Sequence, residues 1–222
     1  MIYKSFLPTL PVLMGYLPLG VAFGILFSQL NLPWYFCLLA SLTIFTGAGQ
    51  FLLVSLLAIH AGFFQIALAS FLLNIRHLFY TLALTQDLKK IGIGKYYVLF
   101  ALTDETFAVL KTFDCEDKDK EKSFVLIAFF NHFYWVSSSM LGMAIGSNLG
   151  FKPEGIEFAL TALFTVLMLQ ALKQAENKKP FFIGIVVSVF GLIIFPSEQF
   201  LFLAILSGIL VLFLGKKWIA NE

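Results

Sequence analysis

Hydrophobic residues fill most of the chain in long stretches that short polar segments interrupt. Most of these stretches are about 18 to 25 residues long, the length that an α-helix needs to cross about 30 Å of hydrocarbon. They lack the alternation of polar and apolar residues that is typical of a transmembrane β-barrel. The pattern predicts eight membrane-spanning helices, at 8–29, 35–58, 61–86, 96–112, 124–148, 156–173, 181–195 and 199–215.

The expected fold class is therefore an all-α, polytopic transmembrane bundle that forms one domain over residues 1–222. The last two segments are only about 15 to 17 residues long and the turn "FPSEQ" joins them, so seven spans remain the chief alternative. Broken or re-entrant helices also fit the pattern. Composition supports the membrane class, because 59% of the residues are hydrophobic and only 13% are charged, against about a quarter charged in soluble domains.

Lysines outside the predicted spans or at their ends indicate the orientation, because cytoplasmic loops carry an excess of Lys and Arg. With eight spans and a cytoplasmic N-terminus, ten lysines lie inside: Lys4, Lys111, Lys118, Lys120, Lys122, Lys173, Lys178, Lys179, Lys216 and Lys217. Four lie outside: Lys89, Lys90, Lys95 and Lys152. This balance favours a cytoplasmic N-terminus. A re-entrant second segment would move the loop "DLKKIGIGK" inside as well. The apolar N-terminus lacks a cleavage pattern of small residues and is expected to remain as the first helix.

Two pairs of segments suggest a weak internal repeat. "GVAFGILF" at 20–27 resembles "GMAIGSNL" at 142–149, and "IFTGAGQFLL" at 44–53 resembles "LFTVLMLQAL" at 163–172. The members of each pair are about 120 residues apart. A parallel repeat would place a site between two halves, as in many transporters, although two apolar helices also match by chance.

The polar group "NIRH", Asn74 to His77, lies nine or more residues from either end of its predicted helix. A charge at that depth of the membrane costs on the order of 3 kcal/mol. Arg76 is therefore expected to face protein or a watery cavity, with Asn74 and His77 in the same region. Both a substrate pathway and a buried ion pair that holds helices together fit this pattern.

The acidic pair Asp104 and Glu105, in "LTDETF", lies near the middle of the fourth predicted span. Adjacent residues on a helix point about 100° apart, so at most one of them faces a given cavity squarely. Either carboxylate is a natural partner for Arg76. Pairing favours the charged form of the acid while burial disfavours it, so such a group could exchange a proton during transport or form a static salt bridge.

The segment "FTGAGQF", residues 45–51, interrupts an otherwise apolar stretch. Gly47 and Gly49 each cost a helix about 1 kcal/mol relative to alanine. One interpretation is a close helix crossing. The other is a broken helix whose freed backbone groups bind a zwitterion, with Thr46 and Gln50 adding side-chain contacts.

Small residues recur four apart, which is a spacing that favours close helix packing. They are Gly20 and Gly24 in the first span and Gly142 and Gly146 in the fifth. The two cysteines and three histidines lack metal-ligand spacing, so no metal site is expected. The chain also lacks a catalytic constellation and a basic patch for nucleic acid, and it is not expected to be an enzyme.

Several motifs together resemble the AzlC family, the large subunit of bacterial branched-chain amino acid exporters. Specific matches are "GYLPLGVAFGILF" (15–27), "IFTGAGQFLLVSLLA" (44–58), "NIRHLFYTLAL" (74–84) and "LTDETFAVL" (102–110). "WVSSSMLGMAIG" (135–146) and "GIEFALTALF" (155–164) match more loosely. The motifs follow the order of the family across most of the chain.

The resemblance implies a secondary transporter of the bacterial inner membrane that exports leucine, isoleucine, valine and also methionine. It implies proton coupling, a small hydrophobic AzlD-type partner subunit and no cofactor. On this basis Arg76 would clamp the substrate carboxylate or hold Asp104, and the "TGAG" backbone would cradle the charged ends. Asp104 or Glu105 would bind the ammonium group or the exchanged proton.

Other classes of protein remain open at this stage. A structural or regulatory membrane subunit would keep Arg76 and Asp104 in a closed pair. A transporter of another small hydrophobic solute would use the same groups. An ion channel would need more polar residues in its spans than the chain contains.

Overall fold

The computed structural model describes most of the chain as helix. It covers residues 2–148, 158, 161–162, 165, 168–169, 172–173, 177–196 and 200–215. Every regular element in these ranges is a helix, in line with the expected all-α class. Two described helices are long and apolar enough to cross a membrane, Ile2–Ser28 and Asp119–Asn148. The predicted span 156–173 lies largely outside the described residues.

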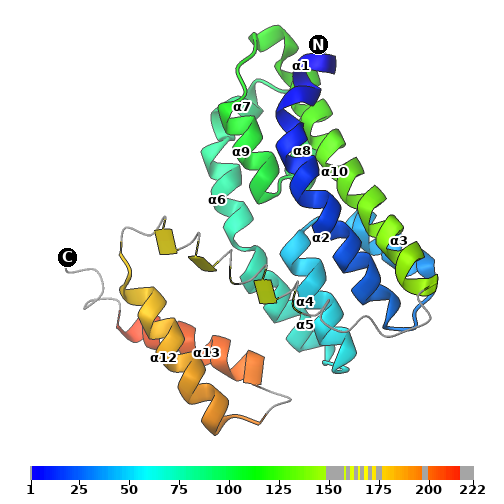
Figure 1. Ribbon diagram of the computed structural model, residues 1–222. Helices are drawn as coiled ribbons and strands as arrows, with labels where there is room; N and C mark the ends of the chain where they lie inside the picture. The colour runs from blue at the N-terminus through cyan, green and yellow to red at the C-terminus, as the bar shows by residue number, and fades with distance from the viewer. Residues whose placement is uncertain are drawn as a thin grey trace.

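The first helical rod comprises α1 (Ile2–Phe6), the 3₁₀ turn η1 (Leu7–Thr9) and α2 (Leu10–Ser28). It packs along α10 (Asp117–Asn148), and this pair forms the most extensive helix contact in the described structure. The two helices run parallel, since successive contacts advance in the same direction along both (Figure 1). The predicted spans 8–29 and 124–148 correspond to these helices, each of which begins earlier than expected.

Glycines allow the backbones of α2 and α10 to approach closely. A methyl group on Gly24 would lie 2.5 Å from the Met143 nitrogen, and one on Gly146 would lie 2.9 Å from the Ile25 Cα atom. Gly20 faces Ser138, and Gly142 faces the backbone of Val21. Because α2 packs closely along α10, we describe positions in the bundle along the axis of α10. We call its two ends the Lys120 end and the Gly146 end.

The segment predicted as one span at 35–58 is a helical hairpin. α3 (Trp34–Thr43) starts at the Gly146 end and reaches half-way along α10, where the Ser41 carbonyl lies 3.3 Å from His132 Nε2. The backbone leaves the helix between Thr43 and Gly47, with Thr46 in an extended conformation. α4 (Gly47–Ala58) then runs back to the Gly146 end. Of the two interpretations that the sequence left open for this segment, the structure agrees with the broken helix, because Gly47 starts a new helix instead of continuing α3.

A second hairpin replaces the span expected at 96–112. α8 (Lys95–Phe100) starts near the Lys120 end, where the Gly94 amide donates to Glu121 Oε1 at 2.9 Å. The chain turns at residues 101–103, and α9 (Asp104–Thr112) returns to the same end. The Thr103 hydroxyl accepts a hydrogen bond from the Thr106 amide at 3.1 Å. This N-cap explains why a new helix begins at Asp104.

Between the two hairpins, the chain crosses from the Gly146 end to the Lys120 end. The span expected at 61–86 is divided into α5 (Phe63–Asn74), α6 (Arg76–Ala83) and α7 (Thr85–Lys89), which follow one another along the bundle. α7 is fixed at the Lys120 end by a salt bridge from Lys120 Nζ to Asp87 Oδ1, 2.7 Å long. The single continuous helix expected here was therefore wrong, but the three shorter helices cross the bundle from one end to the other as that helix would have done.

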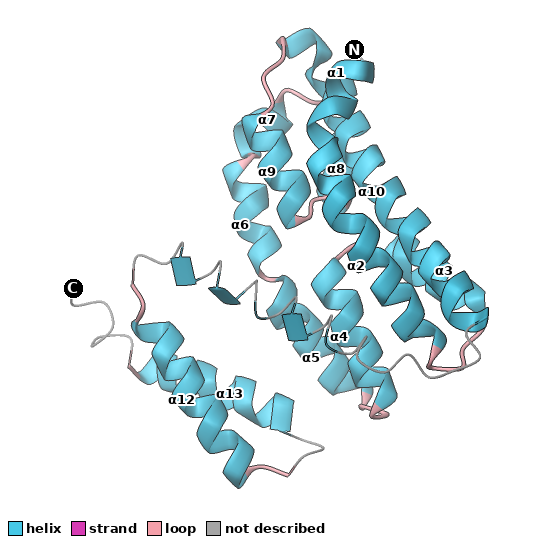
Figure 2. Cartoon of the chain, viewed as in Figure 1, coloured by secondary structure: helices cyan, strands magenta, loops and turns pink. Residues whose placement is uncertain are grey.

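The two hairpins enter the bundle from opposite ends, and their tips meet near its middle. Figure 2 shows both tips as short loops within the helical bundle, between α3 and α4 and between α8 and α9. The α3–α4 tip lies against Trp135, and the α8–α9 tip lies against Asn131. Residues 131–135 mark the middle of α10.

The C-terminal helices α12 (Lys179–Ile194) and α13 (Phe200–Leu214) agree with the segments expected at 181–195 and 199–215. They pack against each other. At 16 and 15 residues they are short for a straight crossing. The count of eight spans, with seven as its alternative, stays a prediction. The proposed repeat also stays a prediction, since most of its partner segment 163–172 lies outside the described residues.

Candidate functional site

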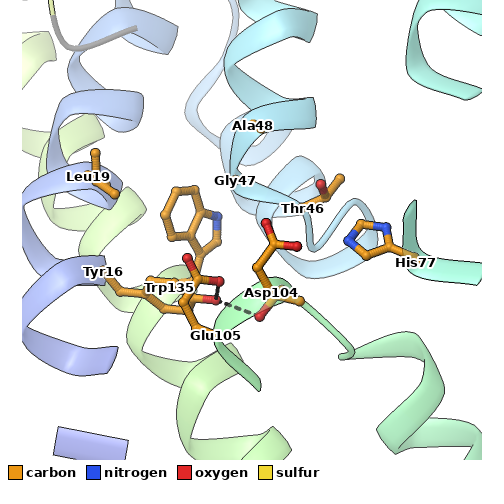
Figure 3. Close-up of a pocket in the computed structure, with 10 residues that line it drawn as sticks. Tyr16, Leu19, Thr46, Gly47, Ala48, His77, Asp104, Glu105 and Trp135 are labelled. Carbon is orange, nitrogen blue, oxygen red and sulfur yellow. Dashed lines mark hydrogen bonds between the residues drawn. The ribbon is translucent and has the colours of Figure 1, made fainter. Parts of the chain in front are cut away.

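A polar cavity lies where the two hairpin tips meet. It encloses about 30 Å³, close to the volume of one water molecule. Its lining comes from α2, α6, α10 and both tips: Tyr16, Leu19, Thr46, Gly47, Ala48, His77, Thr103, Asp104, Glu105 and Trp135 (Figure 3). Five of the residues singled out from the sequence therefore lie together, although they come from three separate segments.

The two carboxylates are the first two residues of α9. Asp104 is partly buried and points between the Trp135 indole and His77, toward the start of α4 (Figure 3). Glu105 is exposed and accepts a hydrogen bond of 2.8 Å from the Tyr16 hydroxyl. The sequence left open which acid faces the site, and in the structure both line the cavity.

A network of hydrogen bonds fixes the α8–α9 tip. The Tyr16 hydroxyl lies 2.7 Å from Thr103 Oγ1, which donates to Thr106 Oγ1 at 3.0 Å. Asn131 Nδ2 of α10 donates to the same Thr106 oxygen at 3.0 Å. Side chains from α2 and α10 therefore fix the position of the start of α9, and of its two carboxylates, along the bundle.

The α3–α4 tip presents the amino end of a helix to the cavity. The first helical hydrogen bond of α4 runs from the Gln50 amide to the Thr46 carbonyl, 2.9 Å long. The amides of Gly47, Ala48 and Gly49 precede that bond. Thr46 does not cap them, because its hydroxyl donates to Asn74 Oδ1 at 2.9 Å. The positive end of the α4 dipole is consequently available to an anionic group.

The two glycines of this tip are needed for space as well as for the turn. A methyl group on Gly47 would lie 3.2 Å from the Trp135 ring. One on Gly49 would lie 2.6 Å from Thr46 Cγ2 and 3.4 Å from Asn74 Nδ2. Larger residues would push the tip away from both α10 and α5.

Gln50 is fully buried and lies behind the cavity lining. Its amide nitrogen donates to the Ala40 carbonyl at 2.8 Å, which joins the two arms of the hairpin. Its oxygen accepts from Trp135 Nε1 at 2.6 Å. Gln50 thus positions the indole that forms one wall of the site.

The "NIRH" residues occupy the junction between α5 and α6. Asn74 ends α5, accepts from Thr46 and donates to the Ser70 carbonyl at 2.8 Å. His77 lines the polar cavity. Arg76 begins α6, but its side chain lies outside the described part of the structure. The pairing of Arg76 with Asp104 therefore stays a prediction.

A second, larger cavity adjoins the polar one. It measures about 270 Å³ and is bounded by Thr43, Ile44, Phe45, Thr46, Asn74, His77, Leu99, Phe100 and Leu102. Thr46 and His77 line both cavities and thus lie at their boundary. Most of the other lining is apolar.

Tyr16, Thr103 and Trp135 are site residues that sequence reasoning missed. Tyr16 and Trp135 lie in apolar helices, yet each carries a polar atom that needs a partner when buried. Thr103 followed by two acidic residues is a helix-start pattern, which would have indicated the break at 101–103. Among the described residues, no group of three or more His, Cys, Asp or Glu side chains could hold a metal ion.

Long apolar helices, two opposed hairpins and a polar cavity half-way along the bundle are features of the class of integral membrane proteins. The chain belongs to the AzlC family, whose model, "AzlC protein", matches residues 11–149.

Several proteins are similar to this chain, and two of those described here align with almost its whole length. A membrane protein of Helicobacter pylori strain 26695 is 36% identical over 217 residues, which are 97% of this chain and 95% of that protein. The Branched-chain amino acid transport protein AzlC of Bacillus subtilis strain 168 is 31% identical over 220 residues, 97% of this chain and 85% of its own. Inner membrane protein YgaZ of Escherichia coli K12 is 28% identical over 179 residues, 76% and 72% respectively. No solved structure matches the chain.

Proposed function

We propose that this chain is the large subunit of a secondary transporter that exports branched-chain amino acids across the bacterial inner membrane. The observation that carries the proposal is the meeting of two opposed hairpin tips around a polar cavity. Broken helices at mid-depth are typical of transporters that bind charged solutes. The printed name of the Bacillus subtilis relative supports branched-chain amino acids as the solute.

The lining of the polar cavity suits the two charged ends of an amino acid. The uncapped amides of Gly47, Ala48 and Gly49 can bind the carboxylate, with the positive end of α4 behind them. The Asp104 carboxylate can accept from the ammonium group, and the Trp135 face can add a cation–π contact. Arg76 is proposed to reach the substrate carboxylate or to balance Asp104. No cofactor is required.

The cavity must enlarge before an amino acid can bind, because 30 Å³ is room for about one water molecule. The described contact that fastens the α3–α4 tip to α5 is the single hydrogen bond between Thr46 and Asn74. We expect this bond to break and re-form as the tips separate and close.

Coupling to the proton gradient is proposed for the two carboxylates. Asp104 and Glu105 are adjacent, border the same cavity and lie about half-way along the bundle, where ionisable groups of a membrane protein commonly mark proton or substrate pathways. The Glu105 carboxylate already accepts a hydrogen bond from the Tyr16 hydroxyl. Asp104 is the better candidate for exchanging a proton as the ammonium group binds and leaves.

The distribution of lysines between the two ends of the bundle indicates its orientation in the membrane. The hairpin topology places Lys4, Lys89, Lys90, Lys95, Lys111, Lys118, Lys120 and Lys122 at the Lys120 end, whereas the loops 29–33 and 59–62 at the other end contain no lysine. By the positive-inside rule, the Lys120 end and the N-terminus face the cytoplasm. We further propose that a small hydrophobic AzlD-type subunit completes the transporter.

Efflux of preloaded radiolabelled leucine tests the function. Cells that express the chain with its small partner should export leucine, and a protonophore should slow the export. Arg76→Ala and Asp104→Asn should each reduce export about tenfold or more, since a hydrogen bond to a charged group contributes about 1.5 to 3 kcal/mol.

Asp114→Asn is the matched control, because Asp114 is an exposed acid outside the polar cavity. This variant should export leucine at the rate of the unaltered protein. Full export by both site variants would show that the two charged groups are structural and would move the site to Gly47 and Gly49. Absence of export by the intact pair would exclude branched-chain amino acid export under these conditions.

A further inference from the structure

The apolar side chains of both hairpin tips line the larger cavity, which Thr43 and Thr46 also border, whereas the residues at the start of α4 and α9 line the polar cavity. In the α3–α4 tip, residues 44–45 line the larger cavity and residues 47–48 line the polar one. In the α8–α9 tip, Leu102 lines the larger cavity, and residues 103–104 line the polar one. In both tips, therefore, the residues that line the larger cavity precede those at the helix start that line the polar cavity.

An aliphatic amino acid has the same division, with two charged groups on one carbon and an apolar side chain beside them. The larger cavity is open to its surroundings and has about 270 Å³, which exceeds the roughly 150 Å³ of an enclosed apolar protein cavity that accepts a benzene molecule. The four carbons of a leucine side chain therefore fit the larger cavity when the charged end is at the polar one.

We propose that the cavity between Ile44, Leu99, Phe100 and Leu102 is the side-chain subsite of the transporter, and that Phe100 sets the largest side chain it accepts. This assignment rests on the proposed function. Amino acids bind across the boundary formed by Thr46 and His77, with the charged groups toward Asp104 and the aliphatic groups toward Phe100.

Phe100 is in a position to limit the length of the subsite. It is the last residue of α8, it lines the cavity and its side chain is 44% exposed. Its ring contacts the His132 ring edge-on, with 5.6 Å between centroids, and α10 thus supports it from behind. A shorter residue at this position lengthens the cavity without removing a buried core side chain.

Binding and transport selectivity test the assignment. The purified complex and cells that express it are presented with alanine, valine, leucine and phenylalanine, and each amino acid is scored for thermal stabilisation and for competition with radiolabelled leucine. Phe100→Ala is expected to raise the affinity for phenylalanine relative to leucine about tenfold. Phe100→Trp is expected to lower the affinity for leucine relative to alanine by a similar factor. Both changes are in the range for adding or removing a methylene-sized group in a pocket.

Phe71→Ala is the matched control, because Phe71 lies on α5, is 61% exposed and lines neither cavity. Phe100→Leu provides a milder change for comparison should Phe100→Ala fold poorly. An unchanged order of preference in the Phe100 variants, with normal leucine binding, would overturn the subsite alone. Absence of amino acid binding by the unaltered complex would overturn the proposed function and the subsite together.

Discussion

At the scale of single residues, the interior of this bundle is notable for polar atoms that have specific partners. Trp135 and Gln50 come from α10 and α4, and their hydrogen bond of 2.6 Å joins two segments that are far apart in the sequence. Tyr16 bonds Glu105 across a similar separation. Sequence patterns could single out Asp104, Thr46 and the glycines, because these residues are unusual within apolar stretches. They could not single out Tyr16 or Trp135, whose importance comes from contacts that only the folded chain creates.

The Trp135–Gln50 bond is open to a direct test. Gln50→Leu leaves the indole N–H and the Ala40 carbonyl without the partner seen here, and the expected loss of stability is about 1 to 3 kcal/mol. The measurement is thermal or denaturant unfolding in detergent.

Trp135→Phe provides the other half of a double-mutant cycle. If the bond stabilises the protein, the double variant should lose less stability than the sum of the two single losses, by about 0.5 kcal/mol or more. Strict additivity of the two losses would show that the bond contributes little.

At the scale of elements, the hydrophobic pattern located the helices but not all of their interruptions. It predicted the helical rods around α2 and α10 and the C-terminal pair well, since each is a long apolar stretch bounded by polar residues. The glycines of "TGAG" indicated the first break. The break at 101–103 lies in "ALT", which contains neither glycine nor proline, so hydropathy alone treats it as helix. The junction at Ile75 has no local signal either, and tertiary contacts such as that between Asn74 and Thr46 determine it.

The contact between α2 and α10 gives a prediction at this scale. Gly24→Ala should destabilise the protein by several kcal/mol or prevent its assembly, because the added methyl group would meet the backbone of Gly142 and Met143. Gly15→Ala lies on the same helix, where nothing is within 4 Å of the added atom, and should be tolerated. Fluorescence-detected size exclusion after heating measures both. Equal stability of the two variants would contradict the close packing.

At the scale of the whole molecule, the hairpins change which loops share a side of the membrane. Eight straight spans would place the loop around residue 61 inside and the loop around residue 92 outside. The hairpin topology places the first at the Gly146 end and the second at the Lys120 end, which reverses both assignments. It also gathers the lysines of the first half of the chain on one side, and the exception that "DLKKIGIGK" posed for eight spans disappears.

Cysteine labelling distinguishes the two topologies. In a background of Cys37→Ala and Cys115→Ser, Phe63→Cys and Ile93→Cys introduce single thiols at positions that are 88% and 86% exposed. With a membrane-impermeant maleimide on intact cells, Phe63→Cys should react and Ile93→Cys should react only after permeabilisation. The opposite pattern would support straight spans.

The opposed entry of the two hairpins has a mechanical consequence. Because the backbones of α2 and α10 are in close contact, we expect these two helices to keep their positions when a hairpin tip moves. Withdrawal of the α3–α4 tip alone would uncover the cavity toward the Gly146 end, and withdrawal of the α8–α9 tip alone would uncover it toward the Lys120 end. In the proposed transporter, each hairpin would therefore close the cavity toward one face of the membrane, and a solute bound between the two tips would be released to either side without a continuous channel opening.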